Sequence, residues 1–168
     1  MNRPGILKGK LIYLSLGSNL GDKIQNLKGA IDLMGNLLGN QLVVSRIYES
    51  QPWGYSSKNH FYNCCLSMAT RLEPIPLMEE ILSIERILGR KREVEGYTDR
   101  LIDIDLLLYE MEVVDHPRLT VPHPSMELRR FVLEPLSEIA PNLVHPINGL
   151  TVTEMLNRCP DLGVITPV

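Results

Sequence analysis

The sequence predicts an α+β fold: a ferredoxin-like β-α-β-β-α-β antiparallel sheet with its helices on one face, plus a C-terminal extension. Three observations predict it. Short apolar runs show the two-residue period of strands, two segments carry apolar residues at helical spacing, and the two kinds of segment follow each other in this order. With 168 residues, 44% of them apolar, the chain can bury a core, and we expect residues 1–168 to form a single domain.

The first half of the chain carries three predicted strands and one helix. Leu11–Leu16 is an apolar run that predicts the first strand, and Asp22 is suited to cap the helix that follows it. We expect the second strand at Leu42–Tyr48 and the third at Phe61–Thr70, separated by an irregular segment over 51–59. Apolar residues three and four apart define the inner face of the helix: Ile24, Leu27, Ile31, Met34 and Leu38.

The next part of the chain is predicted to complete the sheet with one helix and one strand. Pro74 and Pro76 precede a helix expected over Leu77–Leu88, and proline is well tolerated where a helix begins. An irregular segment, Gly89–Asp99, then leads into a strand expected over Arg100–Leu108.

The C-terminal extension is interrupted by prolines. It is expected to begin with a short strand at Glu112–Val114 and to hold a helix near Phe131–Ile139. A last helix is predicted to begin at Thr151, because Thr151 and Glu154 have the spacing of a capping box, and to end at Cys159 before a proline.

The composition excludes several classes of protein. A net charge of −3 and a pI of about 5.8 argue against a general nucleic-acid binder, which carries a basic excess. Three cysteines without paired spacing indicate reduced thiols and a cytoplasmic protein. Because no apolar stretch approaches the length of a membrane span, we expect no membrane partner.

The segment Arg100–Asp105 is the most informative part of the chain. On a strand, Asp103 and Asp105 share one face, ~6.5 Å apart along the backbone, and Ile102 and Ile104 take the other face. Two carboxylates so placed can converge on a pair of Mg²⁺ ions, which lie ~3.5–4 Å apart in two-metal sites. The alternative is a solvated sheet face on which the two aspartates pair with arginines.

Two further patterns suit the binding of a nucleotide and a flat ring. A guanidinium group presents a fork of donors that fits phosphate oxygens, so the basic residues around Gly89–Asp99 predict a polyphosphate clamp. Phe61 and Asn63 share a strand face, and an aromatic ring beside a carboxamide suits a flat heterocycle, although this asparagine could equally satisfy a neighbouring backbone. The basic residues lie within fifteen positions: Arg86, Arg90, Lys91, Arg92 and Arg100.

Together these motifs resemble the 6-hydroxymethyl-7,8-dihydropterin pyrophosphokinases of folate biosynthesis, from Tyr13 to about Gly149. The Asp-x-Asp strand followed by a Pro-His stretch is the most specific part of the resemblance. Tyr97 and Trp53 stand where this family commonly has Trp and Leu, so the aromatic or apolar character is kept. The segments that carry the resemblance are Leu16–Gly21, Ser50–Gly54, Phe61–Asn63, Leu88–Arg90, Arg100–Asp105, Val121–Pro124 and Arg129–Leu136.

The resemblance implies Mg²⁺-dependent transfer of pyrophosphate from ATP to 6-hydroxymethyl-7,8-dihydropterin, with release of AMP. Asp103 and Asp105 would bind two magnesium ions, Arg90 and Arg92 would lie on a mobile loop closing over ATP, and Arg100 would complete the phosphate clamp. The implied catalytic residues are Arg90, Arg100, Asp103 and Asp105. The implied ATP-binding residues are Glu85, Arg92, Arg118, Thr120, His123 and Arg129. The implied pterin-binding residues are Ser50, Trp53, Phe61, Asn63, Tyr97 and Phe131, with the pterin between the two phenylalanines.

Two other classes of function compete with this hypothesis. A non-catalytic ferredoxin-like metabolite-binding domain would need no paired metal carboxylates, and a two-metal nuclease or phosphatase would recruit further acidic or histidine ligands. We expect an enzyme whose partners are ATP and the pterin, with no nucleic acid and no membrane, acting as a monomer.

Overall fold

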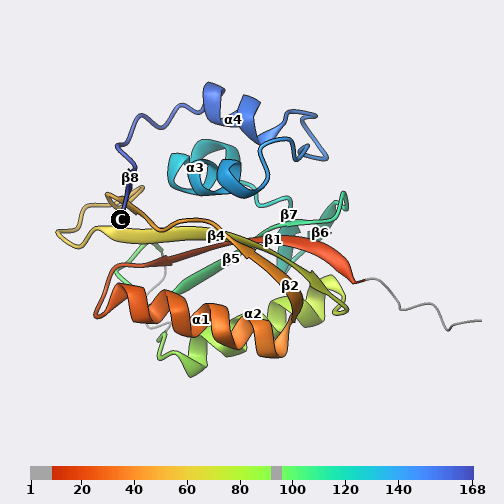
Figure 1. Ribbon diagram of the computed structural model, residues 1–168, viewed down its shortest axis with the longest axis horizontal. Helices are drawn as coiled ribbons and strands as arrows, with labels where there is room; N and C mark the ends of the chain where they lie inside the picture. The colour runs from red at the N-terminus through yellow and green to blue at the C-terminus, as the bar shows by residue number, and fades with distance from the viewer. Residues whose placement is uncertain (1–8, 92–95) are drawn as a thin grey trace, which may run out of the picture.

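Residues 9–91 and 96–168 are described by the computed structural model, in which one sheet separates two layers of helices (Figure 1). The sheet consists of β1 (Lys10–Ser18), β2 (Gly39–Val44), β3 (Tyr48–Ser50), β4 (Phe61–Thr70), β5 (Asp103–Tyr109) and β8 (Thr166–Pro167). Its order is β5-β1-β4-β3-β8, with β2 also paired to β4. Every pairing in this sheet is antiparallel, which confirms the predicted fold class.

Helices α1 (Lys23–Leu37) and α2 (Pro74–Ile87) cover one face of the sheet, as the sequence predicts (Figure 1). The side chain of Asp22 caps α1, because its Oδ1 accepts a hydrogen bond from the backbone N–H of Gln25 at 3.1 Å. Apolar side chains of both helices and of the three longest strands form the main core. Its fully buried members include Ile12, Leu14, Leu16, Leu27, Met34, Leu66, Met68, Leu77, Ile81, Ile84 and Ile102.

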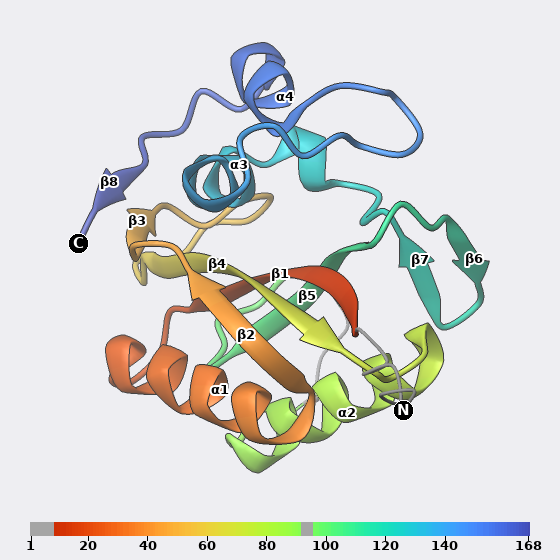
Figure 2. The ribbon, with the colours of Figure 1, turned by 45° about the vertical axis from the view of Figure 1, so that its right-hand side comes forward.

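The C-terminal extension covers part of the opposite face with α3 (Arg130–Ile139) and α4 (Val152–Arg158) (Figure 2). The predicted capping box of α4 is present, since Thr151 and Glu154 exchange both hydrogen bonds. A second apolar cluster lies beneath these helices and includes Tyr13, Cys65, Leu108, Leu133, Leu136 and Met155. Helices therefore pack on both faces of the sheet. A ligand can reach the second face only where α3 and α4 leave it uncovered.

The single strand predicted over Leu42–Tyr48 is wrong, because two strands, β2 and β3, pair with β4 in its place. The chain leaves the ladder around Arg46, whose backbone N–H donates to Glu138 on α3 at 3.0 Å. Within β2 the register shifts between Asn40 and Val43, where Gln41 has a φ of +57°. A tertiary contact with the extension thus divides a run that the local pattern presents as continuous.

The bounds of other elements also differ from the prediction. Helix α2 begins at Pro74, three residues before the predicted start, so both prolines lie in its first turn. The short strand predicted at Glu112–Val114 is displaced to β6 (Val114–His116), because Glu112 closes a turn by donating from its backbone to Tyr109. Strand β6 pairs with β7 (Leu119–Val121), and a short 3-10 helix, η1, follows at Met126–Leu128. The pattern indicated neither of these two elements, nor β8.

In the described part of the chain, every helix is too short or too polar to cross a bilayer.

Candidate active site

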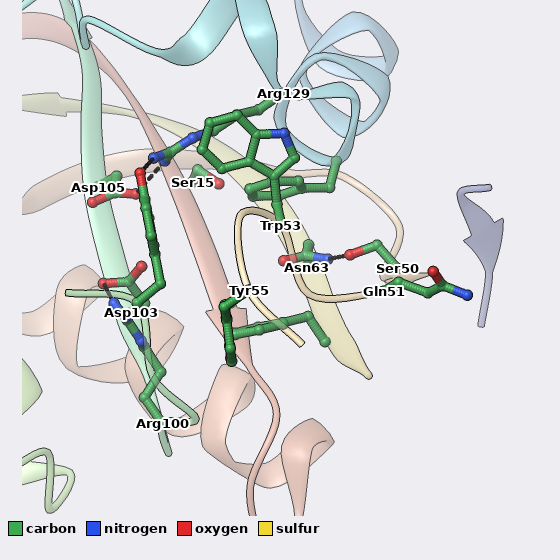
Figure 3. A pocket seen from close by; sticks show the side chains of 14 residues that line it. Ser15, Ser50, Gln51, Trp53, Tyr55, Asn63, Arg100, Asp103, Asp105 and Arg129 are labelled. Atoms are coloured by element: carbon green, nitrogen blue, oxygen red, sulfur yellow. Dashed lines mark hydrogen bonds and ion pairs between the residues drawn. The ribbon is translucent and has the colours of Figure 1, made fainter. Parts of the chain in front are cut away.

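Strand β5 places Asp103 and Asp105 on the face that carries the extension (Figure 3). Ile104 and Leu106 alternate with them and lie in the main core. The alternation predicted from the sequence is therefore correct. In the ladder with β1, Asp105 lies opposite Ser15 and Asp103 lies opposite Gly17. Strand β5 lies at the edge of the sheet and β1 lies beside it. The two carboxylates therefore lie next to two small residues of β1, Ser15 and Gly17.

Asp103 is held by two arginines. Its Oδ1 lies 2.8 Å from Arg90 Nη1 and 3.2 Å from Arg100 Nη1. The same Arg90 nitrogen donates to Glu85 of α2, whose Oε1 also accepts the backbone N–H of Ile104 at 2.8 Å. Arg90 thus bridges a carboxylate of the helix and a carboxylate of the strand.

Asp105 has a more distant cationic neighbour, a neutral imidazole neighbour and a perturbed pKa. Its Oδ2 lies 3.6 Å from Arg129 Nη1 and 3.9 Å from His123 Nε2. Burial, and then the negative charge of Asp103, raise the pKa of Asp105 to about 7, although Arg129 works in the opposite direction. Loss of solvation, together with the charge of Arg129, lowers the pKa of His123 to about 4. His123 Nδ1 faces the backbone N–H of Ser125 at 3.2 Å, so the neutral ring carries its proton on Nε2, toward Asp105.

A first pocket opens between the carboxylates and the loop that joins β3 to β4 (Figure 3). The structure brings all of the pterin-binding residues that the resemblance implies into its lining: Ser50, Trp53, Phe61, Asn63, Tyr97 and Phe131. Asn63 is 2% exposed, and its Nδ2 donates to Ser50 Oγ at 2.8 Å. Its amide oxygen lies against Gly17, where a Cβ would approach it to 3.0 Å. The amide is thus fixed in one orientation, with aromatic side chains around it.

Arg129, implied only as an ATP ligand, sits among three aromatic rings of this pocket. Its guanidinium carbon lies 4.8 Å from the ring centre of Trp53 and 5.9 Å from those of Tyr97 and Phe131. Its Nη2 donates to the Tyr97 hydroxyl at 3.1 Å, and the residue is 8% exposed. Arg129 therefore connects the aromatic wall to Asp105.

A second pocket lies on the other side of the carboxylates. Its lining includes Met78, Glu85, Arg90, Gly96 and His123. The two pockets share one wall, made of Tyr97, Arg100, Asp103, Asp105 and Arg129. A molecule in one pocket and a molecule in the other would thus meet across the two aspartates, with arginines on both sides.

Two of the implied ATP-binding residues, Arg118 and Thr120, line neither pocket, and a third lies outside the described part of the chain. Arg118 is exposed and pairs with Glu79 of α2 at 2.9 Å, and Thr120 is exposed on β7. Arg92 lies outside the described residues, together with part of the loop expected to close over ATP. Arg90 lies in the part of that loop directly after α2, where it is ion-paired with Glu85 and Asp103.

The residues that sequence reasoning missed lie in the lining of the first pocket. Ser15 and Gly17 belong to β1, and only the pairing of β1 with β5 brings them beneath the aspartates. Gln51 and Tyr55 lie in the irregular segment after β3, where the local pattern singles out no position. Across residues 9–91 and 96–168, no three Asp, Glu, His or Cys side chains are arranged to hold a metal ion.

Comparisons with known proteins identify the family of the chain. A family model described as 7,8-dihydro-6-hydroxymethylpterin-pyrophosphokinase (HPPK) matches residues 13–141. The chain is 44% identical over 153 residues to a protein of Methylorubrum extorquens, covering 90% of this chain and 95% of the relative. It is 43% identical over 139 residues to a protein of Porphyromonas gingivalis, covering 81% and 94%. Both relatives are named 2-amino-4-hydroxy-6-hydroxymethyldihydropteridine pyrophosphokinase.

Solved structures share the fold. A crystal structure of Plasmodium falciparum HPPK-DHPS superposes with a TM-score of 0.75 at 16% identity. The match covers 90% of this chain and 45% of that one, so the chain spans less than half the length of the solved protein. At this identity the likeness supports the architecture, and the family follows from the sequence matches.

Proposed function

The chain belongs to the 7,8-dihydro-6-hydroxymethylpterin-pyrophosphokinase family, and we propose that it transfers pyrophosphate from ATP to 6-hydroxymethyl-7,8-dihydropterin in folate biosynthesis. The observation that carries this proposal is the wall shared by the two pockets. A reaction between two bound substrates needs both reacting groups at one place. The two aspartates border both pockets, together with Tyr97, Arg100 and Arg129.

The pterin would occupy the first pocket. Phe61 and Phe131 offer faces for stacking, and Asn63, held by Ser50, offers a fixed amide to the edge of the ring. In this orientation the hydroxymethyl group would lie toward Asp103 and Asp105. Trp53 and Tyr97, whose ring centres are 5.8 Å apart, would limit the access of water to that end of the pocket.

ATP would occupy the second pocket with its phosphates toward the shared wall. Arg100 and Arg129 border both pockets and Arg90 borders the second, so positive charge surrounds the place where pyrophosphate would change partners. In the reaction the pterin hydroxymethyl oxygen forms a bond to the β-phosphorus. The bond from that phosphorus to the bridging oxygen of the α-phosphate breaks, AMP leaves with this oxygen, and the hydroxyl proton is released.

We propose that the two aspartates hold two magnesium ions. Oxygen ligands suit Mg²⁺, and the pKa of Asp105, raised by burial and by the charge of Asp103, marks a place where a cation would relieve repulsion. Asp103 and Asp105 would hold the ions, which when bound neutralise phosphate charge and make the attacking hydroxyl more acidic. Arg90 and Arg100 hold Asp103 in place at one of its oxygens.

We further propose that the enzyme acts as a monomer in the cytoplasm. Cys64, Cys65 and Cys159 are all buried free thiols, as is usual in a reducing compartment.

The decisive experiment is an assay of the purified chain with ATP, 6-hydroxymethyl-7,8-dihydropterin and Mg²⁺, in which the nucleotide product is identified by chromatography. AMP formed in equal amount to pyrophosphorylated pterin supports the proposal. ADP or inorganic phosphate would instead indicate a phosphatase or nuclease. Pterin binding without any turnover, and indifferent to Mg²⁺ and an unreactive ATP analogue, would indicate a metabolite-binding domain.

A further inference from the structure

The carboxylate of Asp99 accepts four hydrogen bonds from side chains that lie far from it in the sequence. Its Oδ1 accepts from Asn19 Nδ2 and from the Tyr55 hydroxyl, each at 2.9 Å. Its Oδ2 accepts from Ser57 Oγ at 2.8 Å and from Asn59 Nδ2 at 2.6 Å. Both oxygens of the carboxylate are therefore engaged, and an aspartate on an irregular segment is held by four side chains.

These bonds join three separate segments of the chain. Asn19 follows β1, residues 55–59 belong to the loop between β3 and β4, and Asp99 belongs to the segment that leads into β5. Asn19 completes the junction, because its Oδ1 accepts the backbone N–H of Arg100 at 2.7 Å and its own N–H donates to the Arg100 carbonyl at 3.1 Å. The position of Arg100 is thus tied to the same cluster.

The joined loops carry the walls of the first pocket. Trp53 comes from the β3–β4 loop and Tyr97 from the segment before β5, and their rings meet edge to face. Tyr55 makes a second link, because its ring meets Phe61 with centres 6.5 Å apart and planes at 84°. Asp99 itself lines neither the first nor the second pocket. An effect of Asp99 on a molecule in the first pocket would therefore act through the residues that it holds.

The protonation states of Asp99 and Tyr55 at neutral pH suit these hydrogen bonds. Burial raises the pKa of Asp99, but the hydrogen bonds, those from Asn59 and Ser57 first, outweigh burial and leave the pKa below its usual value. Burial, and then the bond to Asp99, raise the pKa of Tyr55 to about 12. The aspartate thus remains an acceptor and the phenol a donor, as the geometry requires.

We propose that Asp99 is a positioning residue of the pyrophosphoryl transfer, which joins the β3–β4 loop to the segment before β5 and so sets Trp53 against Tyr97 before the pterin binds. This inference rests on the proposed function for the identity of the ligand. A pocket wall formed in advance reduces the ordering that binding must impose, and the effect falls on pterin affinity rather than on the bond-forming step.

The substitution Asp99→Asn tests the proposal, with Asp115→Asn, at an exposed position on β6, as the matched control. Trp53 is the only tryptophan of the chain, so its fluorescence reports on this wall alone. We expect Asp99→Asn to shift the emission of the substrate-free protein to longer wavelength and to admit acrylamide more readily. We also expect the KM for pterin to rise at least about tenfold while kcat changes less than about threefold. Unchanged emission and KM would overturn the proposal.

A milder variant protects the test against loss of folding. Tyr55→Phe removes one hydroxyl and keeps the ring on Phe61, and Tyr62→Phe on β4 serves as its control. We expect Tyr55→Phe to shift the Trp53 emission and to raise the KM for pterin, both by less than Asp99→Asn does. The double variant should show changes no larger than those of Asp99→Asn alone. Additive effects, or a KM change with unchanged emission, would contradict the proposal.

Failure of the proposed function would be recognised separately. A wild-type chain that forms no AMP would refute the reaction, whereas Trp53 emission in the variants would still decide whether Asp99 sets the pocket wall.

Discussion

The guanidinium carbon of Arg129 lies 4.8 Å from the ring centre of Trp53, and its Nη1 lies 3.6 Å from Asp105. One side chain therefore touches both the aromatic wall of the first pocket and the carboxylate that borders the second. Arg129 is almost fully buried, so it holds this position without much freedom to leave it.

Replacing Arg129 is expected to affect both pockets. Arg129→Ala removes the cation over Trp53 and the positive charge beside Asp105, and we expect kcat/KM to fall at least about tenfold, or ~1.4 kcal/mol of transition-state stabilisation. Steady-state kinetics together with Trp53 emission measure the two effects. The control Arg158→Ala, at an exposed position on α4, should change neither the kinetics nor the emission. Normal kinetics in Arg129→Ala would exclude Arg129 from the site.

Asp105→Ala is expected to abolish turnover while the fold persists. The carboxylate faces the pockets rather than the core, and removing it relieves repulsion from Asp103, so the thermal midpoint should be unchanged or higher. AMP formation and thermal unfolding measure the two outcomes, with Asp115→Ala as the control. Turnover at the wild-type level would refute the assignment of Asp105 to the reaction.

Arg90→Ala is expected to lower kcat at least about tenfold, or ~1.4 kcal/mol, with little change in pterin affinity. Arg90 borders the second pocket but not the first, and it bridges Glu85 to Asp103. Single-turnover kinetics and pterin titration separate the two quantities. Arg71→Ala, at an exposed position after β4, is the matched control. Pterin affinity that falls as much as kcat would contradict the assignment of Arg90 to the second pocket.

Gly17→Ala is expected to weaken pterin binding at least about tenfold by filling the floor of the first pocket. An added Cβ would lie 3.0 Å from Asn63 Oδ1 and 3.4 Å from the ring of Phe61, both implied pterin contacts. Gly35→Ala is the control, because its Cβ would meet only Leu42 at ordinary contact distance. Calorimetric titration of pterin measures the change, and an unaltered Kd would show that the pterin does not rest on β1.

The stability of the protein is expected to fall as the pH drops below about 6.5, in part through His145. This residue is buried, and burial lowers its pKa in the folded state. Its Nδ1 faces the backbone N–H groups of Ile147 and Asn148 at 3.2 and 3.3 Å, which requires a neutral ring. At a pH between the two pKa values, the unfolded chain binds the proton and the folded chain does not. Protonation therefore stabilises the unfolded state and lowers the free energy of unfolding.

The variant His145→Asn keeps an acceptor and does not titrate. Urea unfolding at pH 7.5 and pH 5 should therefore show a smaller loss of stability in the variant than in the wild type. Equal losses in the two proteins would mean that His145 does not contribute to the acid sensitivity.

Much of the fold follows from local patterns. The apolar period that predicted β4 matched its bounds at Phe61 and Thr70, and the capping residues Asp22 and Thr151 marked the starts of α1 and α4. The pattern failed at Arg46, where a contact with α3 from the extension breaks the strand. Such a contact leaves no trace in the residues around it, because its partner lies far along the chain.

The candidate site divides in the same way. Alternation along one strand was enough to place Asp103 and Asp105 together, since the geometry of an extended backbone is local. Only the pairing of β5 with β1 and the packing of the extension showed that Ser15 lies opposite Asp105, that Arg129 lies on Trp53, and that two pockets share a wall. These relationships depend on distances between segments that no periodicity encodes, and they arise when burial of the apolar faces brings the segments together.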